Sequence, residues 1–99
     1  MIFTLHFHSV QNLTEKDIQK IKDELPRLVG ARVKKFRNHL DLTQTELAQA
    51  VGKDRQYLYK IEKGIVTPNI STLGCLAEAL GITLSVLLED LHNSDQKEF

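Results

Sequence analysis

Hydrophobic positions follow two different periods along this chain. Residues 2–8 alternate, with Phe3, Leu5 and Phe7 on one side, which is the period-two pattern of a strand. From residue 14 onward, apolar residues recur every three or four positions, which is typical of amphipathic helices. A lone strand needs a second strand to pair with. The pattern therefore predicts an all-α protein preceded by either a strand that pairs with a second subunit or an extended arm.

Threonine, aspartate and asparagine stand where the helical periods begin. Their side-chain oxygens accept hydrogen bonds from the backbone N–H groups that a helix leaves unpaired at its start. The predicted N-caps are Thr14, Thr43, Asp54, Asn69 and Thr83. Glycines follow three of the periods and predict their ends, at Gly52, Gly64 and Gly81.

Pro26 interrupts the longest helical stretch. Because proline lacks an N–H group and clashes with the preceding turn, we expect it to end or kink the helix over 14–25, with a new helix from about Pro26 to Leu40. This divides the chain into three parts, which are an N-terminal extension (1–25), a helical domain (26–91) and a flexible tail (92–99).

The stretch from Leu42 to Gly64 predicts two short helices joined by a tight turn. Ala48 is small enough for a close helix crossing, and Gly52 gives the turn its backbone freedom. If the second helix directs its leucine and isoleucine inward, its outer face carries arginine, glutamine, tyrosine and lysine. These side chains suit contacts with base edges in the major groove, so the stretch predicts a DNA-binding helix-turn-helix.

Glu62 lies at the boundary of the predicted core, where an isolated carboxylate would be unfavourable. We therefore expect an ion pair, and Arg37 on the preceding long helix is the best candidate for its partner.

Charge and composition limit the classes of function. The 99 residues suit one domain, and 13 basic against 13 acidic residues give zero net charge. Zero charge weighs against strong non-specific binding to DNA. Residues 27–92 nevertheless hold nine lysines or arginines and seven acids, so the basic excess lies in the helix-turn-helix segment. We expect modest non-specific affinity and reliance on dimerisation.

The sequence gives little support for a disulfide, a metal site, a signal peptide or a membrane span. A single cysteine, Cys75, excludes an internal disulfide, and its apolar neighbours predict a buried thiol. His6 and His8 share a strand face, but two ligands do not form a metal site. The start is too short for a signal peptide, and no run of about 20 apolar residues is present. We expect a cytoplasmic protein that is not an enzyme, with no cofactor, metal or membrane association.

The segment from about Leu28 to Leu88 resembles the lambda-repressor-like, Cro/cI-type helix-turn-helix family, also called the XRE family. The matching residues are Arg37, Leu40-x-Leu42-Thr43-Gln44, Glu46-Leu47-Ala48, Gly52, Lys60-Ile61-Glu62-Lys63-Gly64, Pro68, Thr72-Leu73 and Leu76-Ala77-x-Ala79-Leu80-Gly81-Ile82. The resemblance implies a five-helix domain that binds double-stranded DNA as a homodimer on a palindrome. Asp54-Arg55-Gln56-Tyr57 also resembles the recognition-helix start of restriction–modification controller proteins.

The resemblance also implies roles for individual residues. Base contacts fall to Arg55, Gln56, Tyr59 and Lys60. Phosphate contacts fall to Thr43, Gln44, Lys53, Tyr57 and Lys63. Arg37 and Glu62 match the family's internal ion pair. Lys53 departs from the family, which usually places a buried valine or isoleucine there, so either the turn is more exposed or Lys53 contacts phosphate.

The sequence leaves the following functions open. The first is a sequence-specific, dimeric transcriptional regulator. The second is an antitoxin-type interaction module, whose N-terminal extension binds a protein partner while DNA binding serves autoregulation. The zero net charge also leaves open a domain that no longer binds DNA. Surplus apolar residues in the last helix predict a dimer interface formed by Val86, Leu87 and Leu91, which Phe3, Leu5 and Phe7 of the N-terminal strand and the helix over 14–25 complete.

Overall fold

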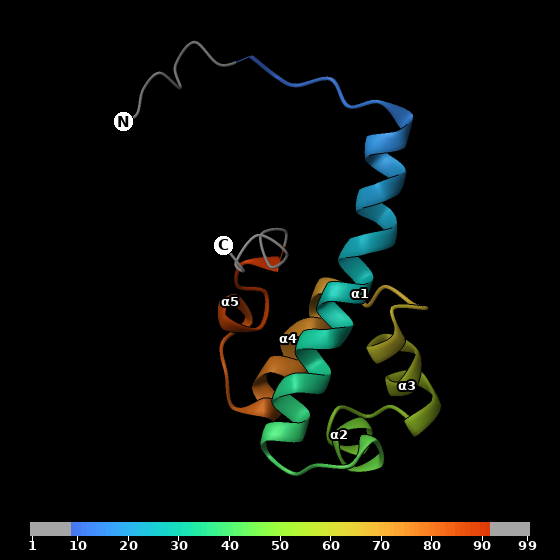
Figure 1. Ribbon diagram of the computed structural model, residues 1–99. Helices are drawn as coiled ribbons and strands as arrows, with labels where there is room; N and C mark the ends of the chain where they lie inside the picture. Colours follow the sequence, from blue (N-terminus) through green and yellow to red (C-terminus); the bar gives the residue numbers. More distant parts are fainter. Residues whose placement is uncertain (1–8, 92–99) are drawn as a thin grey trace.

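Five helices make up the part of the chain that the computed structural model describes, residues 9–91 (Figure 1). They are α1 (Glu15–His39), α2 (Gln44–Ala50), α3 (Arg55–Lys63), α4 (Ile70–Leu80) and α5 (Leu84–Leu87). The all-α, five-helix prediction is therefore confirmed. The predicted strand over 2–8 and the predicted tail over 92–99 lie outside the described residues.

Each helix begins where the sequence predicts a cap. The five N-cap side chains, on Thr14, Thr43, Asp54, Asn69 and Thr83, each accept a hydrogen bond from the backbone N–H three residues ahead. At the first two caps the acidic side chain at that position returns the bond, which completes a capping box. Such a cap stabilises a helix by about 1 kcal/mol, so local chemistry defines these boundaries.

The helix α1 runs without a break through Pro26, and the prediction of two separate helices is wrong. Proline removes one backbone hydrogen bond and costs about 3 kcal/mol in a helix interior. The helix continues because both of its ends are held independently. The Thr14 capping box fixes its start, and from Val29 onward α1 packs into the core. The half before Pro26 extends away from the other helices (Figure 1).

One hydrophobic core joins all five helices. It contains Val29, Val33, Leu47, Ala48, Leu58, Ile61, Leu73, Leu76, Ala77, Leu80 and Leu87. Two expectations are corrected here. Leu87 is fully buried in this core, so it is not available to a dimer interface. Cys75 is exposed, because α4 buries the positions around it, Leu73, Leu76 and Ala77, and turns the thiol outward. None of the helices in residues 9–91 is both long and apolar enough to cross a membrane.

The backbones of α1 and α3 come close together at Gly30. A Cβ atom at this position would lie 2.2 Å from the carbonyl oxygen of Ile61 and 2.8 Å from that of Glu62. The helix α1 therefore crosses the C-terminal end of α3 with no room for a side chain. Gly64, with φ of 76°, lies just beyond and would meet Arg27 in the same way. These two glycines set the position of α3 against α1.

Candidate nucleic-acid interface

The α2–α3 pair forms the helix-turn-helix that the sequence predicts. Leu47 and Ala48 of α2 are buried, as are Leu58 and Ile61 of α3. In the turn Gly52 has φ of 73°, a left-handed conformation that favours glycine. The backbone N–H of Lys53 donates to the carbonyl oxygen of Ala48 at 2.8 Å, which closes the turn.

The outer face of α3 carries the predicted base-reading residues. Arg55, Gln56 and Tyr59 are exposed, and Lys60 is half-buried. This arrangement follows from the helical period, because α3 buries only two residues, Leu58 and Ile61. The structure thus brings the four predicted base-reading residues onto one short helix with its backbone fixed to the core.

Two lysines lie over tyrosine rings beside this face. The Lys63 Nζ atom is 5.9 Å from the centre of the Tyr59 ring, and the Lys53 Nζ atom is 5.0 Å from the Tyr57 ring. Lys53 is exposed, whereas Tyr57 is half-buried against the core. The turn is therefore exposed at position 53. Cation–π contacts of this kind are worth about 0.5–1 kcal/mol at exposed sites and hold the ammonium groups near the helix.

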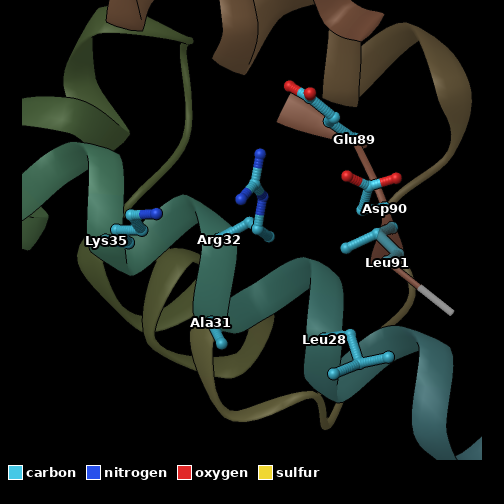
Figure 2. A pocket seen from close by; sticks show the side chains of 7 residues that line it. All are labelled: Leu28, Ala31, Arg32, Lys35, Glu89, Asp90 and Leu91. Carbon is cyan, nitrogen blue, oxygen red and sulfur yellow. The ribbon is translucent and has the colours of Figure 1, made fainter. Parts of the chain in front are cut away.

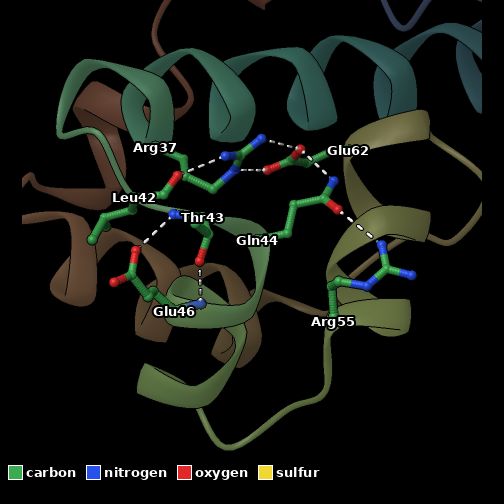
Figure 3. Close-up of polar contacts among 7 residues, drawn as sticks. All are labelled: Arg37, Leu42, Thr43, Gln44, Glu46, Arg55 and Glu62. Atoms are coloured by element: carbon green, nitrogen blue, oxygen red, sulfur yellow. Dashed lines mark hydrogen bonds and ion pairs between the residues drawn. The ribbon is translucent and has the colours of Figure 1, made fainter.

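A buried ion pair ties α1 to α3 (Figure 3). The Arg37 Nε atom donates to Glu62 Oε2 at 2.6 Å, and Nη2 donates to Oε1 at 2.9 Å. The two side chains are only 10% and 3% exposed. A third donor, Nη1, reaches the carbonyl oxygen of Leu42 at 2.7 Å. The hydrogen bonds to Glu62 raise the pKa of Arg37. This is the pair that the position of Glu62 in the sequence predicts.

Gln44 extends this pair to Arg55, at the start of α3. Its Nε2 donates to Glu62 Oε1 at 3.0 Å, and its Oε1 accepts from Arg55 Nη1 at 3.3 Å (Figure 3). Sequence reasoning placed Gln44 at the DNA backbone and missed both contacts. The amide still carries a second N–H, so contact with phosphate is compatible with them. The side chain of Arg55 is thereby oriented from the buried core.

Thr43, a predicted phosphate contact, caps the helix α2. Its hydroxyl accepts from the backbone N–H of Glu46 at 3.0 Å, and the Glu46 carboxylate accepts from the backbone N–H of Thr43 at 2.8 Å. This capping box anchors the first turn of α2, where Gln44 also lies. Within residues 9–91, no three histidine, cysteine or acidic side chains converge in the way that metal ligands do.

Comparisons with known proteins agree with this geometry. A helix-turn-helix family profile matches residues 33–87. The immunity repressor protein of Bacillus phage phi105 is 40% identical over 73 residues, which cover 72% of this chain and 51% of the repressor. The transcriptional regulator SinR of Bacillus subtilis (strain 168) is 29% identical, over 69% of this chain and 62% of SinR. The chain thus spans about half to two thirds of these relatives.

Solved structures of other regulators share the fold. The clp gene regulator ClgR from Corynebacterium glutamicum superposes with a TM-score of 0.69 at 27% identity, over 75% of this chain and 79% of that one. The restriction–modification controller protein C.AhdI from Aeromonas hydrophila superposes with a TM-score of 0.61 at 31% identity. That match covers 63% of this chain and 94% of the controller protein.

Proposed function

This chain belongs to the Cro/cI-type helix-turn-helix family, and we propose that it binds a specific DNA sequence as a homodimer and controls transcription there. It carries the DNA-binding domain of transcriptional regulators, and the relatives that it matches are regulators rather than enzymes. The observation that supports sequence-specific binding most strongly is the polar outer face of α3. A helix of this kind, exposed on one side and fixed to a core on the other, fits the major groove of DNA.

Base readout is assigned to side chains with fitting hydrogen-bonding groups. Gln56 pairs with adenine and Arg55 with guanine, while Tyr59 and Lys60 contact neighbouring bases. The hydrogen bond to Gln44 supports the role of Arg55. It restricts the Arg55 side chain before DNA is bound, so binding costs less conformational entropy.

Phosphate contacts are assigned to the rim of the same surface. Lys53 lies in the turn before α3, Tyr57 lies in the first helical turn of α3, and Lys63 lies at its far end. Thr43 and Gln44 reach phosphate from the start of α2. Since α2 crosses the DNA backbone in this family of motifs, its N-terminal N–H groups add to the favourable field for an anion.

The homodimer and the palindromic operator are part of this proposal. A monomer whose base-reading helix has 9 residues covers a short site, and pairing of two copies doubles the number of base contacts. Val86 and Leu91 are half-buried and stay in the proposed interface, whereas Leu87 does not. Phe3, Leu5 and Phe7 stay in it on their sequence pattern alone. A cytoplasmic location is part of the same proposal.

Selection of bound sequences from random double-stranded DNA tests the proposal. The full chain, at a stated salt concentration, is expected to enrich a two-fold symmetric consensus. A consensus without symmetry would refute the palindrome, and enrichment of nothing over the starting pool would refute sequence-specific binding.

An antitoxin-type module remains a second candidate, favoured by the exposed apolar half of α1. In that case another protein would co-purify with the full chain and would be lost when residues 1–25 are deleted. Recovery of the chain alone from its native cell would refute this candidate.

A further inference from the structure

The half of α1 before Pro26 exposes a row of large apolar side chains. Ile18, Ile21 and Leu25 are 40%, 44% and 36% exposed. They lie on one face of a helix that stands away from the other helices of the domain (Figure 1). Soluble domains rarely leave a continuous apolar face of this kind uncovered.

These residues have the spacing of a coiled-coil seam. With Leu28 they are separated by three, four and three positions, which is the a–d spacing of a heptad repeat. A seam of this kind packs against a helix with the same pattern, and a second copy of the chain supplies one. We propose that two copies associate through a parallel, in-register coiled coil of residues 18–28. This proposal rests on the homodimer proposed above and names the surface that forms it.

The charges beside the seam favour the parallel arrangement. Lys22 occupies an e position, while Asp17 and Glu24 occupy g positions. Parallel helices bring each g position near the e position five residues ahead in the second copy, so Asp17 lies near Lys22. Antiparallel helices would instead bring Lys22 beside Lys22, and Glu24 beside Glu24. Because like charges repel, the sequence of this helix disfavours the antiparallel pair.

The seam ends where α1 enters the domain. The next a position is Arg32, whose Nε donates to the carbonyl oxygen of Leu87 at 3.1 Å and whose Nη2 donates to that of Val86 at 2.5 Å. Arg32 therefore fastens α5 of its own chain. Beyond Leu28 the same face of α1 opens into a hollow of about 440 Å³ that also borders Leu91 (Figure 2). Leu28 of the seam and Leu91 of the interface proposed above thus border one hollow.

Light scattering coupled to size exclusion tests the surface on the full chain. The wild type is expected to have the mass of a dimer. Ile21→Lys is expected to weaken association by about ten-fold or more, because a charge replaces a buried seam residue. Gln19→Lys adds the same charge off the seam and is expected to stay dimeric. Since Ile21 lies outside the core, circular dichroism should show both variants folded.

A monomeric wild type would overturn the proposal, as would an Ile21→Lys variant as dimeric as the wild type. Covalent trapping then tests the orientation. In a Cys75→Ser background, which removes the exposed thiol, Ile21→Cys is expected to form a disulfide-linked dimer on mild oxidation. If cross-linking instead requires a mixture of Ile21→Cys and Leu25→Cys chains, the pairing is antiparallel and the parallel proposal is overturned.

A measurement of DNA binding distinguishes failure of the coiled-coil proposal from failure of the proposed sequence-specific binding. If the wild type binds its selected DNA as a dimer and Ile21→Lys remains dimeric, only the coiled coil is refuted. If the wild type dimerises through position 21 and selects no DNA sequence, the coiled coil stands and sequence-specific DNA binding is refuted.

Discussion

Replacing Gly30 with alanine should destabilise the protein, although the same change usually stabilises a helix. Without other contacts, alanine in a helix interior is favoured over glycine by about 1 kcal/mol. Here the new Cβ would lie 2.2 Å from the Ile61 carbonyl oxygen, so α1 and α3 must separate by about 1 Å. Overpacking of this kind costs about 1–3 kcal/mol, and a clash with backbone falls at the upper end. The net loss is about 2 kcal/mol.

Thermal and urea unfolding measure this loss, and α4 supplies a matched control. A Cβ at Gly74 meets no atom within 4 Å, so Gly74→Ala should raise the stability by about 1 kcal/mol. For a domain of this size, Gly30→Ala should lower the Tm by about 8–16 °C while Gly74→Ala raises it. An unchanged or higher Tm in Gly30→Ala would refute the argument that the crossing at Gly30 has no spare volume.

The remaining predictions concern DNA binding, the buried ion pair and the effect of pH on the cap of α1. Gln56→Ala should weaken binding to the selected DNA by about 1–3 kcal/mol and leave non-specific binding unchanged; equal losses on both would exclude base readout. Lys63→Ala should weaken binding to every sequence and reduce the salt slope by about 1, which titrations at several salt concentrations measure. Glu62→Ala should cost about 3–5 kcal/mol in urea unfolding because it leaves a buried guanidinium unpaired, and the added change Arg37→Met should recover most of it. Hydrogen bonds with the Thr14 backbone and hydroxyl lower the pKa of Asp17. The capping contact of Asp17 is therefore intact above about pH 4 and is lost as the pH falls through the lowered pKa. NMR of the first turn of α1 should show fraying as the pH falls through this pKa, and Asp17→Ala should show no fraying specific to that pH range.

Local chemistry is what the sequence predicts well. The helix starts depend on one side chain and the N–H three residues away, so all five caps follow from short patterns. The outer face of α3 follows from its period. The ion pair between Arg37 and Glu62 spans 25 residues, yet it was predicted, because a buried carboxylate needs a cationic partner and the family resemblance pairs Arg37 with Glu62.

The features that sequence reasoning missed depend on packing between helices. Pro26 marks a helix end in isolation, but the core and the cap on either side hold α1 together. Cys75 and Leu87 both lie among apolar neighbours, and only the assembled fold shows that one faces solvent and the other the core. The sequence could have indicated the close crossing at Gly30. Glycine is unfavourable inside a helix, so its presence there suggests that another backbone packs against it.

Because α1 is continuous, the number of residues in it determines how its N-terminal half is oriented relative to α3. Each residue of an α-helix turns the chain by about 100° and advances it by about 1.5 Å. One residue inserted between Leu25 and Gly30 would therefore rotate the whole N-terminal half about the axis of α1, while α3 stayed in place on the far side of the crossing. Seven inserted residues would nearly restore the original angle and move that half about 10 Å outward. The length of α1 thus sets the angle at which its N-terminal half is oriented relative to α3.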